Sequence, residues 1–142
     1  GRIHRMDVFC FNYRLAPECN SRRLRKMHEG LELSDVFGIR ARDVIVAGDS
    51  AGGNLALSLT LKLKDEGRML PRGLALMSPW TDLTKSGKSY QTRSSVDPVL
   101  DQEYLDRMIQ NYAGGMELTN PYISPLFGKL EGLSACIHSG RG

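Results

Sequence analysis

The chain has 142 residues, of which 41% are hydrophobic and 25% are charged, and its formal net charge is +3. This length suits one domain with one core, and this composition excludes a disordered or collagen-like protein. No apolar run approaches the roughly 20 residues that cross a bilayer, so no membrane span is expected. The modest charge does not indicate a nucleic-acid partner.

The N-terminal segment and the cysteines indicate the compartment. Residues 1–6 lack the apolar core of a signal peptide and do not begin with Met, so we expect an internal segment of a longer protein. Cys10, Cys19 and Cys136 are odd in number and widely spaced, which argues against a zinc site or a disulfide framework. Free thiols fit a reducing cytoplasm, and we expect the protein there.

The first half of the chain alternates short apolar runs with amphipathic stretches. Residues 7–13 predict a strand, and residues 31–37 predict the end of a helix. The run 43–47 is apolar after its first residue, as expected for a strand that is covered on both faces. Leucines recur at i, i+4 and i+8 within 51–66 and predict a helix, which Gly67 closes.

The same alternation continues in the second half. A strand is predicted at 73–78, a polar loop at 81–96 and a helix at 101–112. A second loop at 120–133 leads to a last strand at 135–139. The residues expected on the buried side of the helix are Tyr104, Leu105, Met108, Ile109 and Tyr112. This order predicts one α/β domain over residues 1–142, with a mostly parallel sheet and flanking helices.

Five residues between a strand and a helix carry the chemistry. They are Gly48, Asp49, Ser50, Ala51 and Gly52, in the pattern Gly-x-Ser-x-Gly. This context indicates a nucleophile elbow, a sharp turn that exposes the Ser50 hydroxyl at the helix N-terminus. The turn needs small neighbours, which Gly48 and Gly52 provide, and Gly53 adds room. The Ala51 N–H would be one oxyanion donor. The alternative is an ordinary strand–turn–helix with an idle serine.

Further motifs surround the elbow. The strings are YRLAPE (13–18), GDSAGGNLA (48–56), SPWTDL (78–83), DP (97–98), YAGG (112–115) and SPL (124–126). In this order and spacing the chain resembles the hormone-sensitive-lipase-like carboxylesterases, the bacterial family IV esterases. The resemblance implies a partial α/β-hydrolase fold, with about strands 4 to 7 of the family sheet. It implies hydrolysis of small carboxylic esters through an acyl-enzyme on Ser50, with Asp49 structural, without metal or cofactor. It leaves open a homodimer of the parent enzyme.

The family site has further parts that these residues do not contain. They are a His-Gly-Gly motif that completes the oxyanion hole, an acid, and a later histidine. We therefore expect little or no esterase activity from this chain alone. Of His4, His28 and His138, only His138 is placed near the carboxyl end of a predicted strand as a candidate base. Asp82 is a candidate acid, although the resemblance makes both residues structural.

Residues 19–27 depart from the family pattern, which continues there with a Phe-Pro-Ala-Ala stretch. The chain instead has a basic cluster at 22–26. One back-translation of residues 18–28, read from its third base, gives Val-Gln-Phe-Pro-Ala-Ala-Ala-Glu-Asp-Ala. We interpret the cluster as two compensating frame shifts, and the alternatives are a solvated surface and a nucleic-acid contact.

Three functions remain open at this stage. The first is a carboxylesterase of which this chain is a part. The second is a non-catalytic protein that binds a small molecule on the same scaffold, and the third is a degenerate remnant without function.

Overall fold

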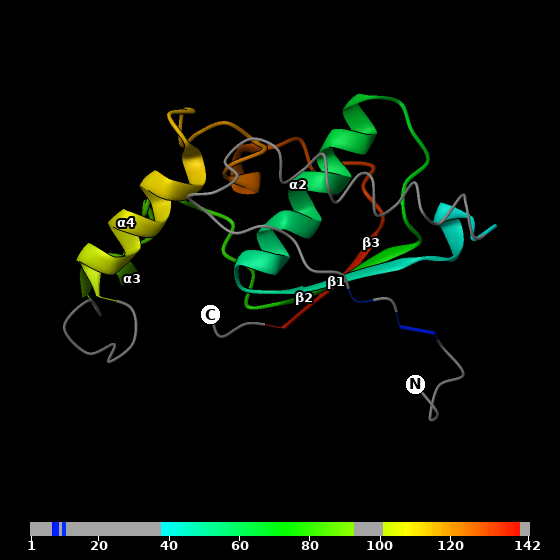
Figure 1. Ribbon diagram of the computed structural model, residues 1–142, viewed down its shortest axis with the longest axis horizontal. Helices are drawn as coiled ribbons and strands as arrows, with labels where there is room; N and C mark the ends of the chain where they lie inside the picture. The colour runs from blue at the N-terminus through cyan, green and yellow to red at the C-terminus, as the bar shows by residue number, and fades with distance from the viewer. Residues whose placement is uncertain (1–6, 9, 11–37, 93–100, 140–142) are drawn as a thin grey trace.

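The computed structural model of the chain describes residues 7, 8, 10, 38–92 and 101–139 (Figure 1). Its elements are η1 (Ala41–Asp43), β1 (Ile45–Asp49), α2 (Ala51–Asp65), β2 (Gly73–Met77), α3 (Ser89–Thr92), α4 (Gln102–Ala113), η2 (Pro125–Phe127) and β3 (Ala135–Ser139). The expected alternation of strands and helices is confirmed from residue 38 onward. The predicted helix end at 31–37 and the basic cluster lie outside the described residues.

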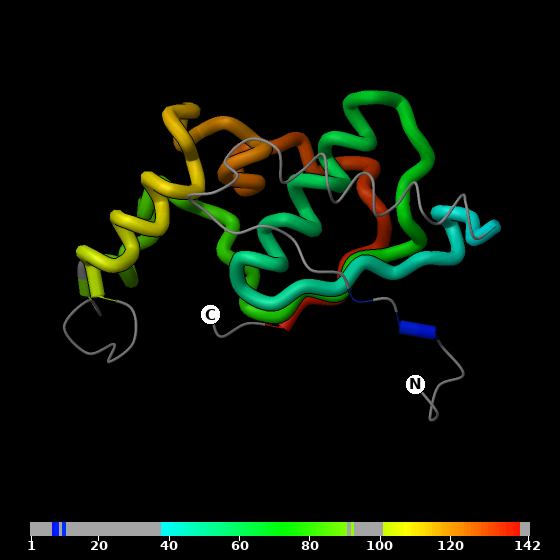
Figure 2. The backbone as a smooth tube through the Cα atoms, in the orientation of Figure 1, coloured from blue at the N-terminus to red at the C-terminus, as the bar shows by residue number. Residues whose placement is uncertain are grey.

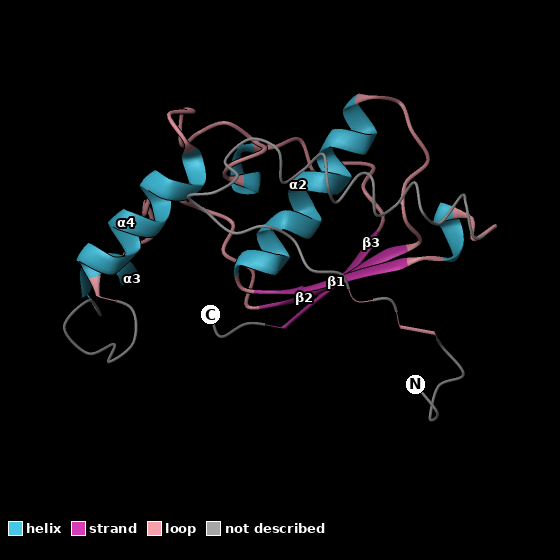
Figure 3. Cartoon of the chain, in the orientation of Figure 1, coloured by secondary structure: helices cyan, strands magenta, loops and turns pink. Residues whose placement is uncertain are grey.

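The three strands form one parallel sheet in the order β1-β2-β3 (Figure 3). The register pairs Asp49 with Met77 and Met77 with Ser139, so the carboxyl ends of all three strands meet at one edge. Parallel neighbours need a crossover connection, and α2 supplies the one between β1 and β2. The predicted fold class, a parallel sheet with flanking helices, is confirmed.

The structure departs from the predicted elements by more than one residue at their ends in a few places. The strand expected at 43–47 begins at Ile45, because Asp43 closes the short turn η1 through its N–H to Arg40 O (2.8 Å) and its carboxylate to Arg40 Nε (2.8 Å). The short helix α3 lies within the predicted loop 81–96. Asp7, Val8 and Cys10, the described residues of the first predicted strand, lie in no strand.

Helix α2 lies against one face of the sheet (Figure 1). A cluster of buried apolar residues joins the two layers: Ala56, Leu57, Leu74 and Leu76, with Val46 and Leu133 beside them. The opposite side of α2 is buried as well, through Leu55, Leu59 and Leu63. The helix is therefore enclosed on nearly all sides, more than the leucine stripe alone predicts.

The other face of the sheet is open within the described residues. Its side chains include Ile45 (47% exposed), Met77 (49%) and Ile137 (78%). No described helix packs on this face. Within the described residues, β1 therefore alternates between exposed and half-buried side chains, and cover of its other face stays a prediction.

Helix α4 packs through a narrow stripe. Leu105, Ile109 and Ala113 are buried, and the last two form a cluster with Leu83 and other loop residues. Tyr104, predicted on the buried side, is instead 45% exposed, so that prediction was wrong. Its N–H is capped by the Asp101 carboxylate, in the first turn of α4, which extends away from the sheet (Figure 1).

Replacement of Leu59 tests this arrangement, because Leu59 is 1% exposed in the enclosed helix. We expect Leu59→Ala to lower the free energy of unfolding by about 2–5 kcal/mol, since it leaves a cavity in the cluster with Leu55 and Leu63. Leu130→Ala is the control, because Leu130 is 44% exposed, and it should change stability by about 0.5 kcal/mol or less. Urea denaturation measures both, and equal losses would contradict the packing described.

Candidate active site

Ser50 occupies the turn between β1 and α2. Its backbone angles are φ 50° and ψ −113°, with a positive φ that residues bearing a side chain rarely adopt. Such conformations cost roughly 1–3 kcal/mol and persist only where surrounding contacts fix them. The residue is exposed, at the carboxyl edge of the sheet and directly before the helix.

Three backbone hydrogen bonds hold Ser50 in this conformation. Its N–H donates to the carbonyl oxygen of Met77 (2.9 Å). Its own carbonyl oxygen accepts from the N–H of Trp80 (3.0 Å) and the N–H of Asn54 (3.1 Å). Figure 2 shows the chain that leaves β2 running beside this turn. The turn is therefore built from two segments of the chain, and neither forms it alone.

Two glycines are sterically required at the turn. A Cβ on Gly48 would lie 2.3 Å from the backbone of Gly52, and a Cβ on Gly53 would lie 2.7 Å from Pro79 Cβ. A Cβ on Gly52 meets no described atom within 4 Å. Small residues are therefore required at Gly48 and Gly53. The expectation for Gly48 and for the room at Gly53 agrees with this, and the expectation for Gly52 does not.

The N-terminus of α2 faces the same edge. The first helical hydrogen bond runs from Asn54 N–H to Ser50, so the N–H groups of Ala51, Gly52 and Gly53 have no carbonyl partner inside the helix. The aligned peptide dipoles place partial positive charge there. An oxyanion formed at Ser50 would lie in this field, and the Ala51 N–H as its donor stays a prediction.

Asp82, the candidate acid after β2, is engaged within its own loop. Its Oδ1 accepts from Thr84 N–H (2.8 Å) and Oγ1 (2.6 Å), and its Oδ2 accepts from Ser86 N–H (2.9 Å) and Oγ (2.7 Å). Partial burial raises the pKa of Asp82, but these hydrogen bonds outweigh it and keep the pKa below its ordinary value. The carboxylate is an anchor for the loop.

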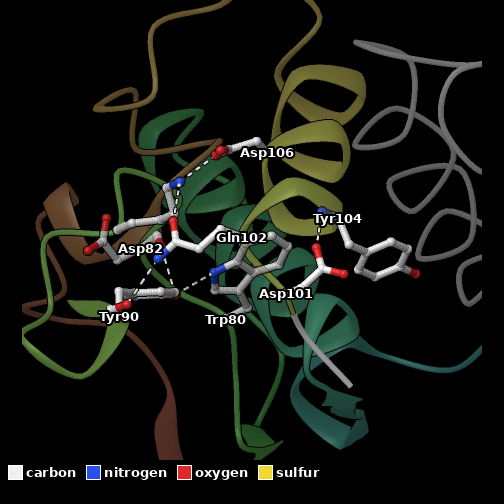
Figure 4. Close-up of polar contacts among 8 residues, drawn as sticks. Trp80, Asp82, Tyr90, Asp101, Gln102, Tyr104 and Asp106 are labelled. Atoms are coloured by element: carbon white, nitrogen blue, oxygen red, sulfur yellow. Dashed lines mark hydrogen bonds and ion pairs between the residues drawn. The ribbon is translucent and has the colours of Figure 1, made fainter. Parts of the chain in front are cut away.

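A polar cluster connects this loop to α4 (Figure 4). Trp80 Nε1 donates to Tyr90 Oη (2.8 Å), and Gln102 Nε2 donates to Tyr90 O (3.1 Å). Lys85 forms an ion pair with Asp106. The indole is therefore fixed on one side by Tyr90, while the backbone of Trp80 bonds the turn at Ser50.

His138 is the one histidine within the described residues, and it lies in β3. The register aligns it with Leu76 in β2 and, through Leu76, with Gly48 in β1. Since neighbouring strands lie about 4.8 Å apart, the backbones of His138 and Gly48 are separated by roughly 10 Å. A general base needs a heavy-atom distance of about 2.6–3.2 Å. Among the described residues, neither His138 nor Asp82 makes a side-chain hydrogen bond to Ser50, and the Asp82 carboxylate is bonded to Thr84 and Ser86 instead.

A family model described as α/β hydrolase fold matches residues 2–139. The chain belongs to this family. An esterase of Acinetobacter venetianus is 38% identical over 130 residues, which make up 90% of this chain and 43% of that protein. The hormone-sensitive lipase of Mus musculus is 30% identical over 114 residues, which make up 77% of this chain and 15% of that protein.

Comparison with solved structures places the chain among the same proteins. An esterase from the bacterial hormone-sensitive lipase family matches with a TM-score of 0.83 and 30% identity, over 89% of this chain and 43% of that one. A hormone-sensitive lipase from a metagenome library matches with a TM-score of 0.82 and 36% identity, over 89% of this chain and 44% of that one. These matches confirm the resemblance to the hormone-sensitive-lipase-like esterases. This α/β hydrolase spans less than half the length of these relatives.

Asn54 was not singled out from the sequence of this α/β hydrolase, beyond its place in the family string. It is 1% exposed, and its side chain bonds groups of Trp80, Ile123 and Tyr112. The available signal was a carboxamide at the start of an otherwise apolar helical stripe. Its partners lie 26 to 69 residues away, so the sequence alone did not identify them.

Within the described part of this chain, no three His, Cys, Asp or Glu residues lie grouped as metal ligands. The prediction that it needs no metal or cofactor is not tested by this. The longest described helix, α2, has 15 residues. No helix among the described residues is long and apolar enough to cross a membrane. Cys10 and Cys136 are exposed and carry free thiols.

Paired glycine substitutions test the turn. We expect Gly48→Ala to lower the free energy of unfolding by about 1–3 kcal/mol or more, because its Cβ would collide with the Gly52 backbone. Gly52→Ala is the matched control and should be neutral or stabilise by up to about 1 kcal/mol, since its Cβ meets open space. Urea denaturation compares them, and an equal loss in both variants would refute the assignment.

Asp82→Asn tests the loop anchor. The folded pKa of Asp82 lies below its ordinary value of 3.8, so the carboxylate stabilises the fold above about pH 4 and loses this effect as pH falls through the folded pKa. The variant should be less stable than the wild type at pH 7, and the difference should shrink at pH 3. Urea midpoints at both pH values measure this. Asp49→Asn, at an exposed carboxylate, is the control, and a difference independent of pH would contradict the account.

Proposed function

We propose that the longer protein to which this segment corresponds hydrolyses carboxylic esters with Ser50 as its nucleophile. The observation that carries the proposal is the strained backbone of an exposed serine between a parallel strand and the N-terminus of α2. A strand–turn–helix of this kind is the setting of a nucleophile elbow. The printed names of similar proteins, an esterase and hormone-sensitive lipases, support the same class of reaction.

The chemistry follows from this position. Ser50 Oγ attacks the ester carbonyl carbon and gives its proton to a base, while the Ala51 N–H and the helix dipole stabilise the oxyanion. The bond to the alcohol oxygen then breaks, the alcohol leaves with the proton, and the acyl group remains on Ser50. Water attacks this acyl-enzyme, which releases a carboxylic acid and restores the serine. Small esters with short or medium acyl chains are the proposed substrates.

The 142 residues by themselves should turn over esters slowly or not at all. A serine hydrolase without its base loses orders of magnitude in turnover. His138 lies two strands from the elbow, and both carboxylate oxygens of Asp82 are engaged in their own loop. A non-catalytic protein that binds a small molecule on this scaffold, or a degenerate remnant, would show the same arrangement.

Two broader proposals accompany the reaction. The exposed thiols of Cys10 and Cys136 favour a reducing compartment, and we place the protein in the cytoplasm. For the longer protein a homodimer stays a proposal.

A chimera tests the nucleophile. In the chimera, the 130 residues of the Acinetobacter venetianus esterase that match this chain are replaced by the matching residues of this chain. The rest of that esterase is kept and supplies the segments outside the match. We expect the chimera to hydrolyse p-nitrophenyl butyrate, and Ser50→Ala to lower kcat by about ten-thousand-fold or more. Ser89→Ala, at an exposed serine in α3, is the control and should leave kcat unchanged.

The outcomes separate the candidates. A chimera that stays active with Ser50→Ala contradicts the nucleophile. A folded chimera without activity, judged by circular dichroism, favours the non-catalytic or degenerate alternative. The 142-residue chain assayed in parallel should show no hydrolysis that depends on Ser50.

A further inference from the structure

The carboxamide of Asn54 is buried and fully bonded. Its two Nδ2 protons go to Trp80 O (2.7 Å) and Ile123 O (2.9 Å). Its Oδ1 accepts from Tyr112 Oη (2.7 Å) and from Ser58 Oγ (3.3 Å). A buried carboxamide is tolerated only where such partners replace water, so this arrangement specifies one position for each segment that supplies a partner.

One of these bonds closes a ring around the turn. Trp80 donates its N–H to Ser50 O (3.0 Å), while its own carbonyl oxygen accepts from Asn54 Nδ2. The backbone N–H of Asn54 also bonds Ser50 O (3.1 Å). Both polar backbone groups of Trp80 are thus bonded to the first turn of α2, and the side chain of Asn54 sets the distance between the two segments.

The remaining partners anchor Asn54 itself. Ile123 belongs to the loop before η2, and Tyr112 belongs to the last turn of α4. Asn54 therefore lies where the helix, the chain after β2, the loop and α4 converge. A residue that only satisfied its own helix would not need partners from these other segments.

From this geometry we propose that Asn54 is a positioning residue, which holds Ser50 in its strained conformation through Trp80. The inference rests on the proposed function, in which Ser50 is the nucleophile. A positive φ at a serine relaxes unless neighbouring contacts fix it. Met77 and Trp80 both bond Ser50 from outside the helix, and Asn54 fixes Trp80.

Amide hydrogen exchange of the 142-residue chain, followed by NMR, tests this directly. The probes are the backbone N–H groups of Ser50 and Trp80, with that of Leu59 inside α2 as the reference. In Asn54→Ala we expect exchange at Ser50 and Trp80 to accelerate by about tenfold more than at Leu59, because the turn opens locally. A residue that supported only global stability would raise all three rates by the same factor, and that result would overturn the proposal.

Thr60→Val is the matched control. Thr60 is buried in the same helix, but its hydroxyl bonds Ala56 O (2.8 Å) within α2 and touches neither segment of the turn. We expect this variant to change the exchange rates at Ser50, Trp80 and Leu59 alike. Selective acceleration at Ser50 and Trp80 in Thr60→Val would also count against a specific role for Asn54.

A measurement on the unmodified chain tests the proposal without requiring that any variant folds. The side-chain NH₂ protons of Asn54 should exchange about tenfold or more slowly than those of a free carboxamide, since both are bonded to carbonyl oxygens. Exchange at the free rate would overturn the proposal. None of these measurements depends on catalysis, so they test the positioning role of Asn54 by itself. Whether Ser50 is the nucleophile is tested separately, by the Ser50→Ala chimera.

Discussion

The carbonyl oxygen of Ser50 accepts two N–H groups at once, and the arrangement around it depends on that double acceptance. The bond from Asn54 begins α2, and the bond from Trp80 fixes the chain that leaves β2. Strand, helix and loop therefore converge on one backbone atom. The strained dihedral angles of Ser50 are what direct this oxygen toward both donors, because an ordinary extended residue would continue the strand.

Burial of α2 is what makes this strain sustainable. The helix packs on the sheet through one set of apolar side chains and on Leu70 and Tyr112 through another, so its N-terminus is fixed from two sides. Gly48 and Gly53 allow the helix and the chain after β2 to approach the turn closely. A reactive group on rigid elements is positioned more accurately than one on a loop, and Ser50 has such elements on both sides.

Coverage of the sheet is uneven within the described residues. Parallel sheets are usually buried on both faces, yet among the described helices it is α2 that packs on this one, and Ile137 on the other face is 78% exposed. The packing of the described core is therefore concentrated between α2 and one face of the sheet. The loop after β2 adds local order of its own, since Asp82 accepts four hydrogen bonds within five residues of chain.

The sequence by itself determined the features that depend on neighbours along the chain. Strand–helix alternation, the leucine repeat of α2 and the Gly-x-Ser-x-Gly turn are local patterns, and they predicted the parallel sheet and the place of Ser50. Within the described residues, tertiary structure alone decided which face of β1 packs against α2 and that Tyr104 is exposed. It likewise decided that a Cβ at Gly53, unlike one at Gly52, would collide with Pro79. It also decided the role of Asn54, whose partners lie up to 69 residues away. Periodicity records which side of an element is apolar, whereas hydrogen bonds and close contacts between distant segments exist only once those segments have packed together.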